Sequence, residues 1–130
     1  MSESSKILVV DDEPFILRSV TYVLRKEGFT VLEAHHGEEA LEVIRTQNPA
    51  LVFLDVMMPR KTGYEVLETM KAEGLLSRCK VVLLTAKGQE SDKVCGKELG
   101  AHEYMTKPFS PMLIVKTAKE ILTPTPAKQR

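Results

Sequence analysis

The sequence predicts an α/β fold, a doubly wound sheet of five parallel strands that alternate with five helices. The first observation behind this prediction is a repeated pattern in which four apolar residues run directly into polar ones. The pattern occurs at residues 7–10 before Asp11 and Asp12, at residues 51–54 before Asp55, and at residues 81–84 before Thr85. Continuous apolar runs of this length are typical of strands covered on both faces, as in parallel sheets. The second observation is that segments with helical spacing of apolar residues lie between these runs.

The first half of the chain repeats the order strand, turn and helix. After the first strand, Pro14 suits the first turn of a helix, and Gly28 ends that helix. The segment Phe29–Glu33 is predicted to be a short second strand. The second helix opens at Gly37 and is broken at Asn48-Pro49, because a residue before proline disfavours helical backbone.

The second half continues the alternation, with a longer loop after Asp55 that spans residues 57–63. Ser110 and Pro111 provide an N-cap and a first-turn proline for the last helix. The predicted elements are, in order, a helix ending near Gly74, a weakly apolar helix from about Gly88 to Leu99, a strand at Glu103–Thr106, and a helix through Leu122.

Length limits this chain to one domain, because 130 residues can form a single core but not two. We expect that domain to occupy residues 6–122. Residues 1–5 are expected to be disordered. Residues 123–130 read as a polar, proline-containing tail or the start of a linker.

Charge and hydropathy argue against several functions. Lys plus Arg (18) equals Asp plus Glu (18), so no general attraction draws this chain to nucleic acid or to an anionic membrane. No apolar run could span a bilayer and no secretory signal is visible, so we expect a cytoplasmic location. Cys79 and Cys95 are too few and too far apart for a disulfide framework or a zinc site.

The polar residues that end the strands should meet at one edge of the sheet, where parallel α/β folds bind ligands. There Asp11, Asp12 and Asp55 would form a concentrated negative site that a cation must neutralise. Carboxylate oxygens suit Mg²⁺, which often completes its shell with water and phosphate oxygens. Thr85 and Lys107 add a hydroxyl and a positive charge that can bind phosphoryl oxygens. The sequence therefore predicts a metal site for phosphate chemistry, in which an aspartate is a competent nucleophile.

Four motifs, in their order and spacing, resemble the receiver domains of two-component response regulators. They are Val-Val-Asp-Asp-Glu13, Leu-Asp-Val-Met-Met-Pro59, Leu-Leu-Thr-Ala86 and Tyr-Met-Thr-Lys-Pro-Phe109. The resemblance runs from about Lys6 to Leu122. It implies a CheY-like fold with the flavodoxin-like strand order 2-1-3-4-5.

The resemblance also implies a role for each site residue. Asp55 matches the phosphoacceptor. Asp12 matches the direct carboxylate ligand of Mg²⁺, with Mn²⁺ a possible substitute, and Asp11 matches the acid that acts on the metal through a water. The backbone carbonyl of Met57 matches the remaining protein ligand. Asp55 is itself a metal ligand in this pattern.

Three further positions match the groups that sense the phosphoryl group. Thr85 matches a hydroxyl that moves to bind a phosphoryl oxygen, and Lys107 matches an ammonium that pairs with another. Tyr104 matches an aromatic switch that turns inward when the hydroxyl moves.

The implied function is a phosphorylation-dependent signalling switch. Asp55 would receive its phosphoryl group from a sensor histidine kinase, a histidine phosphotransfer protein or a small phosphodonor. The domain would catalyse its own phosphorylation and dephosphorylation, and no activity on external substrates is expected. The surface that responds would lie at about Gly88–Leu122 and control a downstream protein or a missing output domain. The chain would be a monomer or a phosphorylation-promoted dimer.

Other interpretations exist for parts of the pattern. A phosphatase or phosphotransferase of another aspartyl-phosphate class would place a second acid at position 57, where this chain has Met57. A flavodoxin-like cofactor binder needs a glycine- or hydroxyl-rich loop after the first strand, where this chain has acids. A receiver-fold module that no longer uses phosphorylation would not need the site residues that this chain retains, which are Asp12, Asp55, Thr85 and Lys107. Taken singly, the acids and Thr85 could be caps or turn residues, and His35, His36 and His102 are interpreted as loop residues.

Overall fold

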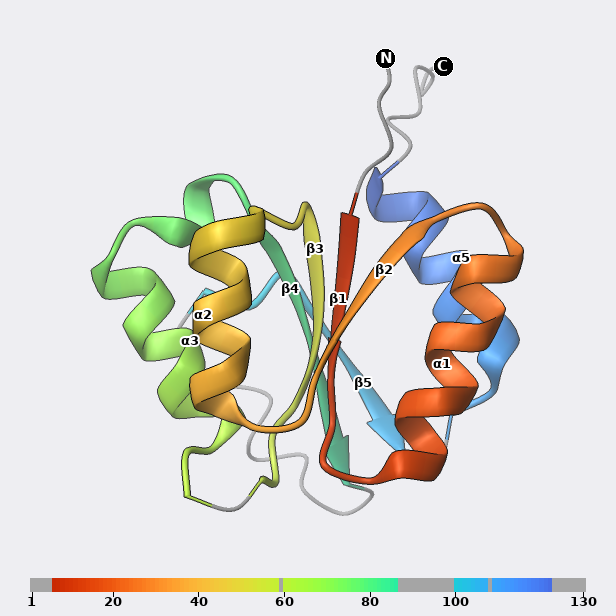
Figure 1. The fold of residues 1–130 in the computed structure, drawn as a ribbon, viewed down its shortest axis with the longest axis horizontal. Coiled ribbons are helices and arrows are strands. Elements are labelled where there is room, and N and C mark those ends of the chain that lie inside the picture. The colour runs from red at the N-terminus through yellow and green to blue at the C-terminus, as the bar shows by residue number, and fades with distance from the viewer. Residues whose placement is uncertain (1–5, 59, 87–99, 108, 123–130) are drawn as a thin grey trace.

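The computed structural model describes residues 6–58, 60–86, 100–107 and 109–122. The expected terminal segments, residues 1–5 and 123–130, lie outside this range. The strands form one parallel sheet, as the apolar runs predict, in the order β2-β1-β3-β4-β5 that the family resemblance implies (Figure 1). Their bounds are β1 Lys6–Val10, β2 Thr30–Ala34, β3 Leu51–Asp55, β4 Lys80–Ala86 and β5 Glu103–Lys107.

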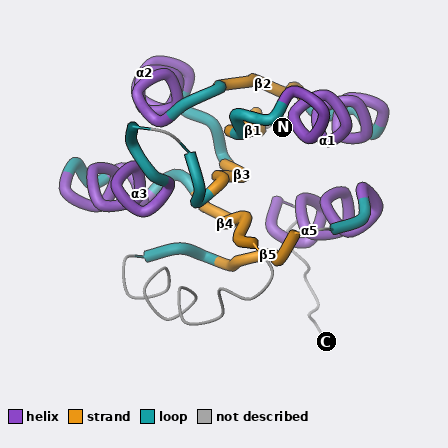
Figure 2. The backbone as a smooth tube through the Cα atoms, turned by 90° about the horizontal axis from the view of Figure 1, so that it is seen from below, coloured by secondary structure: helices purple, strands orange, loops and turns teal. Residues whose placement is uncertain are grey.

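Helices cover both faces of this sheet. Figure 2 shows α1 and α5 on one side of the strands and α2 and α3 on the other. Their bounds are α1 Pro14–Lys26, α2 Gly37–Gln47, α3 Gly63–Ala72 and α5 Pro111–Leu122, and a short 3-10 helix, η1, spans Leu75–Ser77. The fourth of the five predicted helices, from about Gly88 to Leu99, falls on residues 87–99, outside the described residues. Among the helices that are described, none is long and apolar enough to cross a membrane.

The continuous apolar runs are explained by burial on both faces of the sheet. In β1, Leu8 and Val10 belong to the core under α2 and α3, whereas Ile7 and Val9 belong to the core under α1 and α5. All four side chains are fully buried. Burying one such side chain contributes about 1.5–3 kcal/mol to folding, so the two layers hold the sheet between both pairs of helices.

The helix ends follow the predicted signals. Pro14 opens α1, and Gly28 follows it with a φ of 98°, a left-handed value that glycine adopts without strain. The Ser110 hydroxyl accepts a hydrogen bond from the Leu113 N–H at 3.2 Å, which makes Ser110 the cap of α5. His36, interpreted from the sequence as a loop residue, is the N-cap of α2, because its Nδ1 accepts from the Glu39 N–H at 3.3 Å.

Two strand boundaries differ from the prediction. The second strand is Thr30–Ala34, one residue later than predicted. The last strand extends through Lys107, because Lys107 pairs in register with Ala86 of β4. This extension places Lys107 on a strand end and not in a loop.

Cys79 is a buried free thiol between η1 and β4. Burial raises the pKa of this thiol to about 12, and the nearby charge of Arg78 only partly opposes that effect. Cys79 is therefore an unreactive core residue near neutral pH. Cys95 lies outside the described residues.

Candidate functional site

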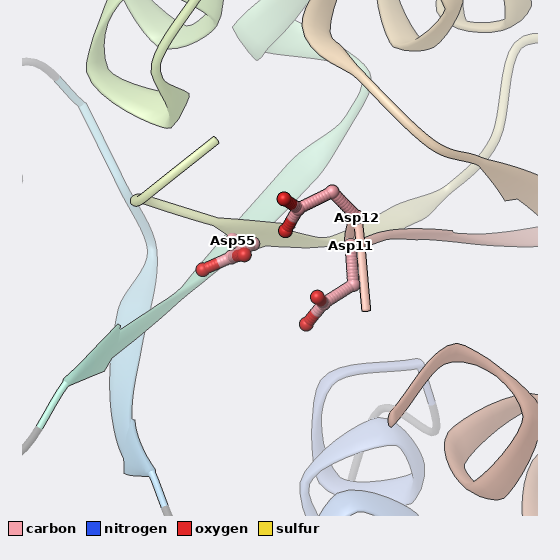
Figure 3. Close-up of side chains that lie close together, drawn as sticks. All are labelled: Asp11, Asp12 and Asp55. Carbon is pink, nitrogen blue, oxygen red and sulfur yellow. The ribbon is translucent and has the colours of Figure 1, made fainter. Parts of the chain in front are cut away.

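Three carboxylates meet at the carboxyl ends of β1 and β3. Asp55 is the last residue of β3, and Asp11 and Asp12 directly follow β1, whose Val10 is paired with Leu54. One carboxylate oxygen of each residue lies within 4.8 Å of the others. Figure 3 shows the three side chains gathered at these strand ends. Asp11 and Asp55 are buried and Asp12 is exposed, so two of the three negative charges are largely removed from water.

Lys107 reaches this cluster from the end of β5. Its Nζ lies 3.0 Å from Asp11 Oδ2 and 3.3 Å from Asp55 Oδ1, and its side chain is 20% exposed. One ammonium thus bridges the two buried carboxylates. Because a buried charge is costly unless it is paired, Lys107 compensates part of the cost of this cluster in the absence of a metal.

The electrostatic surroundings raise the pKa of Asp55 to about 7. Burial is the main cause, and the negative charge of Asp11 adds to it, while Lys107 and the Met57 N–H work in the opposite direction. Burial alone would lower the pKa of Lys107, but its hydrogen bond to Asp11 and the charge of Asp55 outweigh burial and raise it. Ionisation of Asp55 is therefore disfavoured mainly by burial and further by the charge of Asp11, and a bound cation would offset both effects.

A shallow cavity of about 300 Å³ opens over the cluster and is lined by Asp12, Glu13, Asp55, Met57 and Lys107. The Met57 N–H donates to Asp55 Oδ1 at 3.2 Å, and the Glu13 N–H donates to Asp11 Oδ1 at 2.9 Å. These bonds fix the orientations of both buried carboxylates. Because Asp55 lines the cavity, a small group of about the size of a phosphoryl group can approach it from solvent.

Thr85 holds a buried hydroxyl on the neighbouring strand. It follows Leu84, which is paired with Asp55, so it lies toward the same edge of the sheet. Thr85 is 1% exposed, and its Oγ1 has no hydrogen-bond partner among the residues that the structure describes. A buried hydroxyl without a partner is unfavourable, so Thr85 is a candidate to bind a ligand at this edge of the sheet.

Tyr104 is not part of the carboxylate cluster. It lies on β5 opposite Leu83 and packs, half-buried, against the core under α2 and α3. Thr85 is paired with Thr106, so Tyr104 lies two positions before the partner of Thr85 on β5. The predicted site residues that the structure brings together are Asp11, Asp12, Asp55, Met57 and Lys107, with Thr85 on the adjoining strand.

Residues 7–119 match the family model of the response regulator receiver domain. The chain belongs to this family. The receiver domain accounts for the sheet order and for the position of the acidic cluster at the strand ends.

Curated relatives of this receiver domain include two bacterial transcriptional regulators. The chain is 46% identical over 119 residues to the alkaline phosphatase synthesis transcriptional regulatory protein PhoP of Bacillus subtilis, covering 92% of the chain and 49% of PhoP. It is 40% identical to the phosphate regulon transcriptional regulatory protein PhoB of Pseudomonas aeruginosa, covering 92% of the chain and 52% of PhoB. The chain therefore spans about half the length of these relatives.

Solved structures give the same result. The chemotaxis response regulator CheY4 of Vibrio cholerae superposes with a TM-score of 0.85 at 30% identity, over 92% of this chain and 100% of CheY4. A CheY-like response regulator receiver domain protein of Methanospirillum hungatei superposes with a TM-score of 0.83 at 31% identity, over 91% of this chain and 93% of that protein.

Gly63 is a residue of this receiver domain whose importance the sequence did not reveal. Its N–H donates to the Val56 carbonyl at 3.0 Å, which brings the start of α3 against the end of β3. A Cβ at Gly63 would lie 2.5 Å from the Asp55 carbonyl oxygen and 2.9 Å from the Val56 Cα. The only sequence signal was a glycine at the first position of a helix, which does not indicate that backbone contact.

We expect Gly63→Ala to lower the free energy of unfolding by about 2–3 kcal/mol, because the backbone around Asp55 must move to admit the methyl group. Urea unfolding followed by far-UV circular dichroism measures this loss. Gly74→Ala is the control, since Gly74 has a φ of 74° but a Cβ added there would meet no atom within 4 Å. Its cost should be about 1 kcal/mol from backbone strain alone. Equal losses in the two variants would contradict the role assigned to the contact with Asp55.

Proposed function

We propose that this receiver domain is a phosphorylation-dependent signalling switch in which Asp55 accepts the phosphoryl group. The observation that carries the proposal is the position of Asp55, whose carboxylate lies at the base of a small cavity beside two further carboxylates and one ammonium. An oxygen of Asp55 forms a bond to phosphorus as the bond from phosphorus to the donor nitrogen or oxygen breaks, and the donor keeps that electron pair. Such a transfer needs chiefly positioning and charge compensation.

Asp11, Asp12, Asp55 and the backbone carbonyl of Met57 are the groups that would hold Mg²⁺, or Mn²⁺ in its place. The fit rests on three carboxylate oxygens within 4.8 Å of one another, a spacing that suits a hard divalent ion. When bound, the ion neutralises the carboxylates and the incoming phosphoryl oxygens. Asp11 also pairs with Lys107, so metal binding requires a redistribution of the contacts of Lys107.

Thr85 and Lys107 would report the arrival of the phosphoryl group. The Thr85 hydroxyl, which has no hydrogen-bond partner in the described part of the chain, can donate to one phosphoryl oxygen, and the Lys107 ammonium can pair with another. Because these contacts exist only with the phosphoryl group present, they favour one of two conformations. We propose that Tyr104 turns inward in that conformation and that the responding surface spans about Gly88–Leu122, which includes β5 and α5.

The partner would be a sensor histidine kinase or a histidine phosphotransfer protein in the cytoplasm. Residues 6–122 would form the receiver unit, and a downstream protein or an output domain would read its state. The names of PhoP and PhoB as transcriptional regulators, together with the half-length match, support a transcriptional output outside these residues. The chain itself would bind no nucleic acid directly, and it would be a monomer or a phosphorylation-promoted dimer.

Incubation with Mg²⁺ and acetyl phosphate is expected to add one phosphoryl group to the protein. Intact-mass spectrometry detects the addition, and peptide mapping after borohydride trapping locates it at Asp55. Chelation of Mg²⁺ should remove the uptake, and so should Asp55→Asn, because an amide is not a nucleophile toward phosphorus. Equal phosphate uptake by Asp55→Asn would refute the assignment of Asp55.

A further inference from the structure

The methionine side chains of this protein differ sharply in their access to solvent. Met58, Met70 and Met105 are 6%, 0% and 7% exposed, whereas Met57 and Met112 are 57% and 75% exposed. Among the residues that the structure describes, a dissolved oxidant therefore reaches only the thioethers of Met57 and Met112. Exposure is the main factor that decides which methionine is oxidised.

Met57 differs from Met112 in its position relative to Asp55. Met57 lines the cavity over the carboxylate cluster together with Asp55 and Lys107, and its backbone N–H bonds to Asp55 Oδ1 at 3.2 Å. Met112 lies in the first turn of α5 and is not among the residues that line this cavity. A chemical change on the Met57 side chain thus takes place at the entrance to the phosphoacceptor.

We propose that Met57 is an oxidation site through which hydroperoxides shorten the lifetime of the phosphorylated state. The proposal rests on the function proposed above for Asp55. In the modifying step, one oxygen of the hydroperoxide forms a bond to the Met57 sulfur while the O–O bond breaks. Sulfur loses two electrons, and the hydroperoxide is reduced to water or an alcohol. Methionine sulfoxide reductases reverse this change.

The expected effect on lifetime follows from the polarity of the two forms. The thioether is apolar and a weak hydrogen-bond acceptor, so it holds water less well than the four charged side chains that line the cavity beside it. The sulfoxide oxygen is a strong acceptor and holds water at the same place. Because hydrolysis of an aspartyl phosphate requires attack by water on phosphorus, more ordered water at the entrance accelerates it.

The test compares phosphoryl half-lives before and after peroxide treatment. Protein is treated with hydrogen peroxide, freed of peroxide, phosphorylated with acetyl phosphate and Mg²⁺, and followed after removal of the donor. Peptide mass spectrometry gives the sulfoxide content of each methionine. We expect treatment to shorten the half-life about threefold, a barrier change of about 0.7 kcal/mol. Methionine sulfoxide reductases should restore the original value.

Two variants assign the effect to one side chain. Met112→Leu should keep the full response to peroxide, because it removes the other exposed thioether. Met57→Leu should show the same half-life with and without treatment, whatever its untreated value is. This variant retains both cysteines, so a response caused by thiol oxidation would persist in it.

The outcomes separate this proposal from the function on which it rests. If Met57 is converted to the sulfoxide and the half-life stays constant or lengthens, the proposal is wrong while phosphorylation of Asp55 stands. Oxidation of the buried methionines ahead of Met57 also overturns it. If the untreated protein takes up no phosphate, the function proposed for Asp55 is wrong, and the proposal for Met57 falls with it.

Discussion

Asp55→Asn is expected to raise the free energy of unfolding in Mg²⁺-free buffer at pH 8 by about 2 kcal/mol, although the same substitution should abolish the proposed phosphorylation. The reason is that the pKa of Asp55 in the folded protein is raised from 3.8 to about 7 by burial and by the charge of Asp11. A carboxylate that the fold holds at a raised pKa costs stability once it is ionised. Asparagine has nearly the same shape and carries no charge.

The sign of the pH dependence follows from proton binding. Between pH 4 and pH 7 the folded protein retains a proton on Asp55 that the unfolded chain has lost. The contribution of Asp55 to stability is therefore most favourable below pH 4, declines as the pH rises, and levels off above pH 7. The full effect of such a shift is about 4 kcal/mol. Asparagine also lacks the charge-assisted contact that the Asp55 carboxylate makes with Lys107, and solvent at the cavity screens the charge of Asp55. These two effects reduce the expected gain in unfolding free energy to about half of this value.

Urea unfolding at pH 5 and pH 8 with a chelator present measures this difference. The gain of Asp55→Asn over the wild type should be smaller at pH 5 than at pH 8. Added Mg²⁺ should stabilise the wild type and narrow the gap, as expected for an ion that binds the carboxylate cluster of the folded state only. Glu68→Gln, which neutralises an exposed acid on α3, serves as the control and should change stability little at either pH. A variant less stable than the wild type at pH 8 would show that the ionised Asp55 carboxylate does not reduce the stability of the folded protein.

Lys107→Met is expected to tighten Mg²⁺ binding about tenfold while it destabilises the metal-free protein by about 2–3 kcal/mol. Lys107 occupies oxygens of Asp11 and Asp55 at 3.0 Å and 3.3 Å, so it competes with a cation for the same ligands. Removing the ammonium leaves buried carboxylates without compensation. The folded protein then loses stability, and the remaining charge attracts a divalent ion more strongly.

Isothermal titration with Mg²⁺ and urea unfolding in chelator measure these two effects. Lys119→Met is the matched control, because Lys119 pairs with Glu27 at 2.7 Å on an exposed surface, so the substitution removes the same charge far from the cavity. It should leave Mg²⁺ affinity nearly unchanged and cost about 0.5 kcal/mol. Weaker Mg²⁺ binding in Lys107→Met would mean that Lys107 supports the metal site and does not compete with it.

Most of the fold could be predicted from local patterns. The apolar runs in β1, β3 and β4 are long enough to identify buried strands, and their polar ends identify the edge where Asp11, Asp12 and Asp55 meet. Pro14 and Ser110 correctly marked the starts of α1 and α5. The role of His36 as a helix cap was missed, because histidine is not a strong capping signal and its tautomer decides whether it can accept.

Other features depend on residues that are far apart in sequence. The contact of Lys107 with Asp11 joins positions that are 96 residues apart, and the close approach of Gly63 to the Asp55 carbonyl depends on how a loop closes. No local pattern encodes such distances. The exposures of Met57 and Met112 likewise follow from which faces the packed helices leave open.

By itself, the sequence determined the order of elements, the residue types available at the sheet edge and the family resemblance, because periodicity and motif spacing are local properties of the chain. Only the tertiary structure decided that Lys107 bridges two buried carboxylates, that the Thr85 hydroxyl has no partner within the described residues, and that Met57 is exposed beside Asp55. The physical reason is that burial, charge coupling and hydrogen-bond partners arise from packing between distant segments. These quantities set the pKa of Asp55.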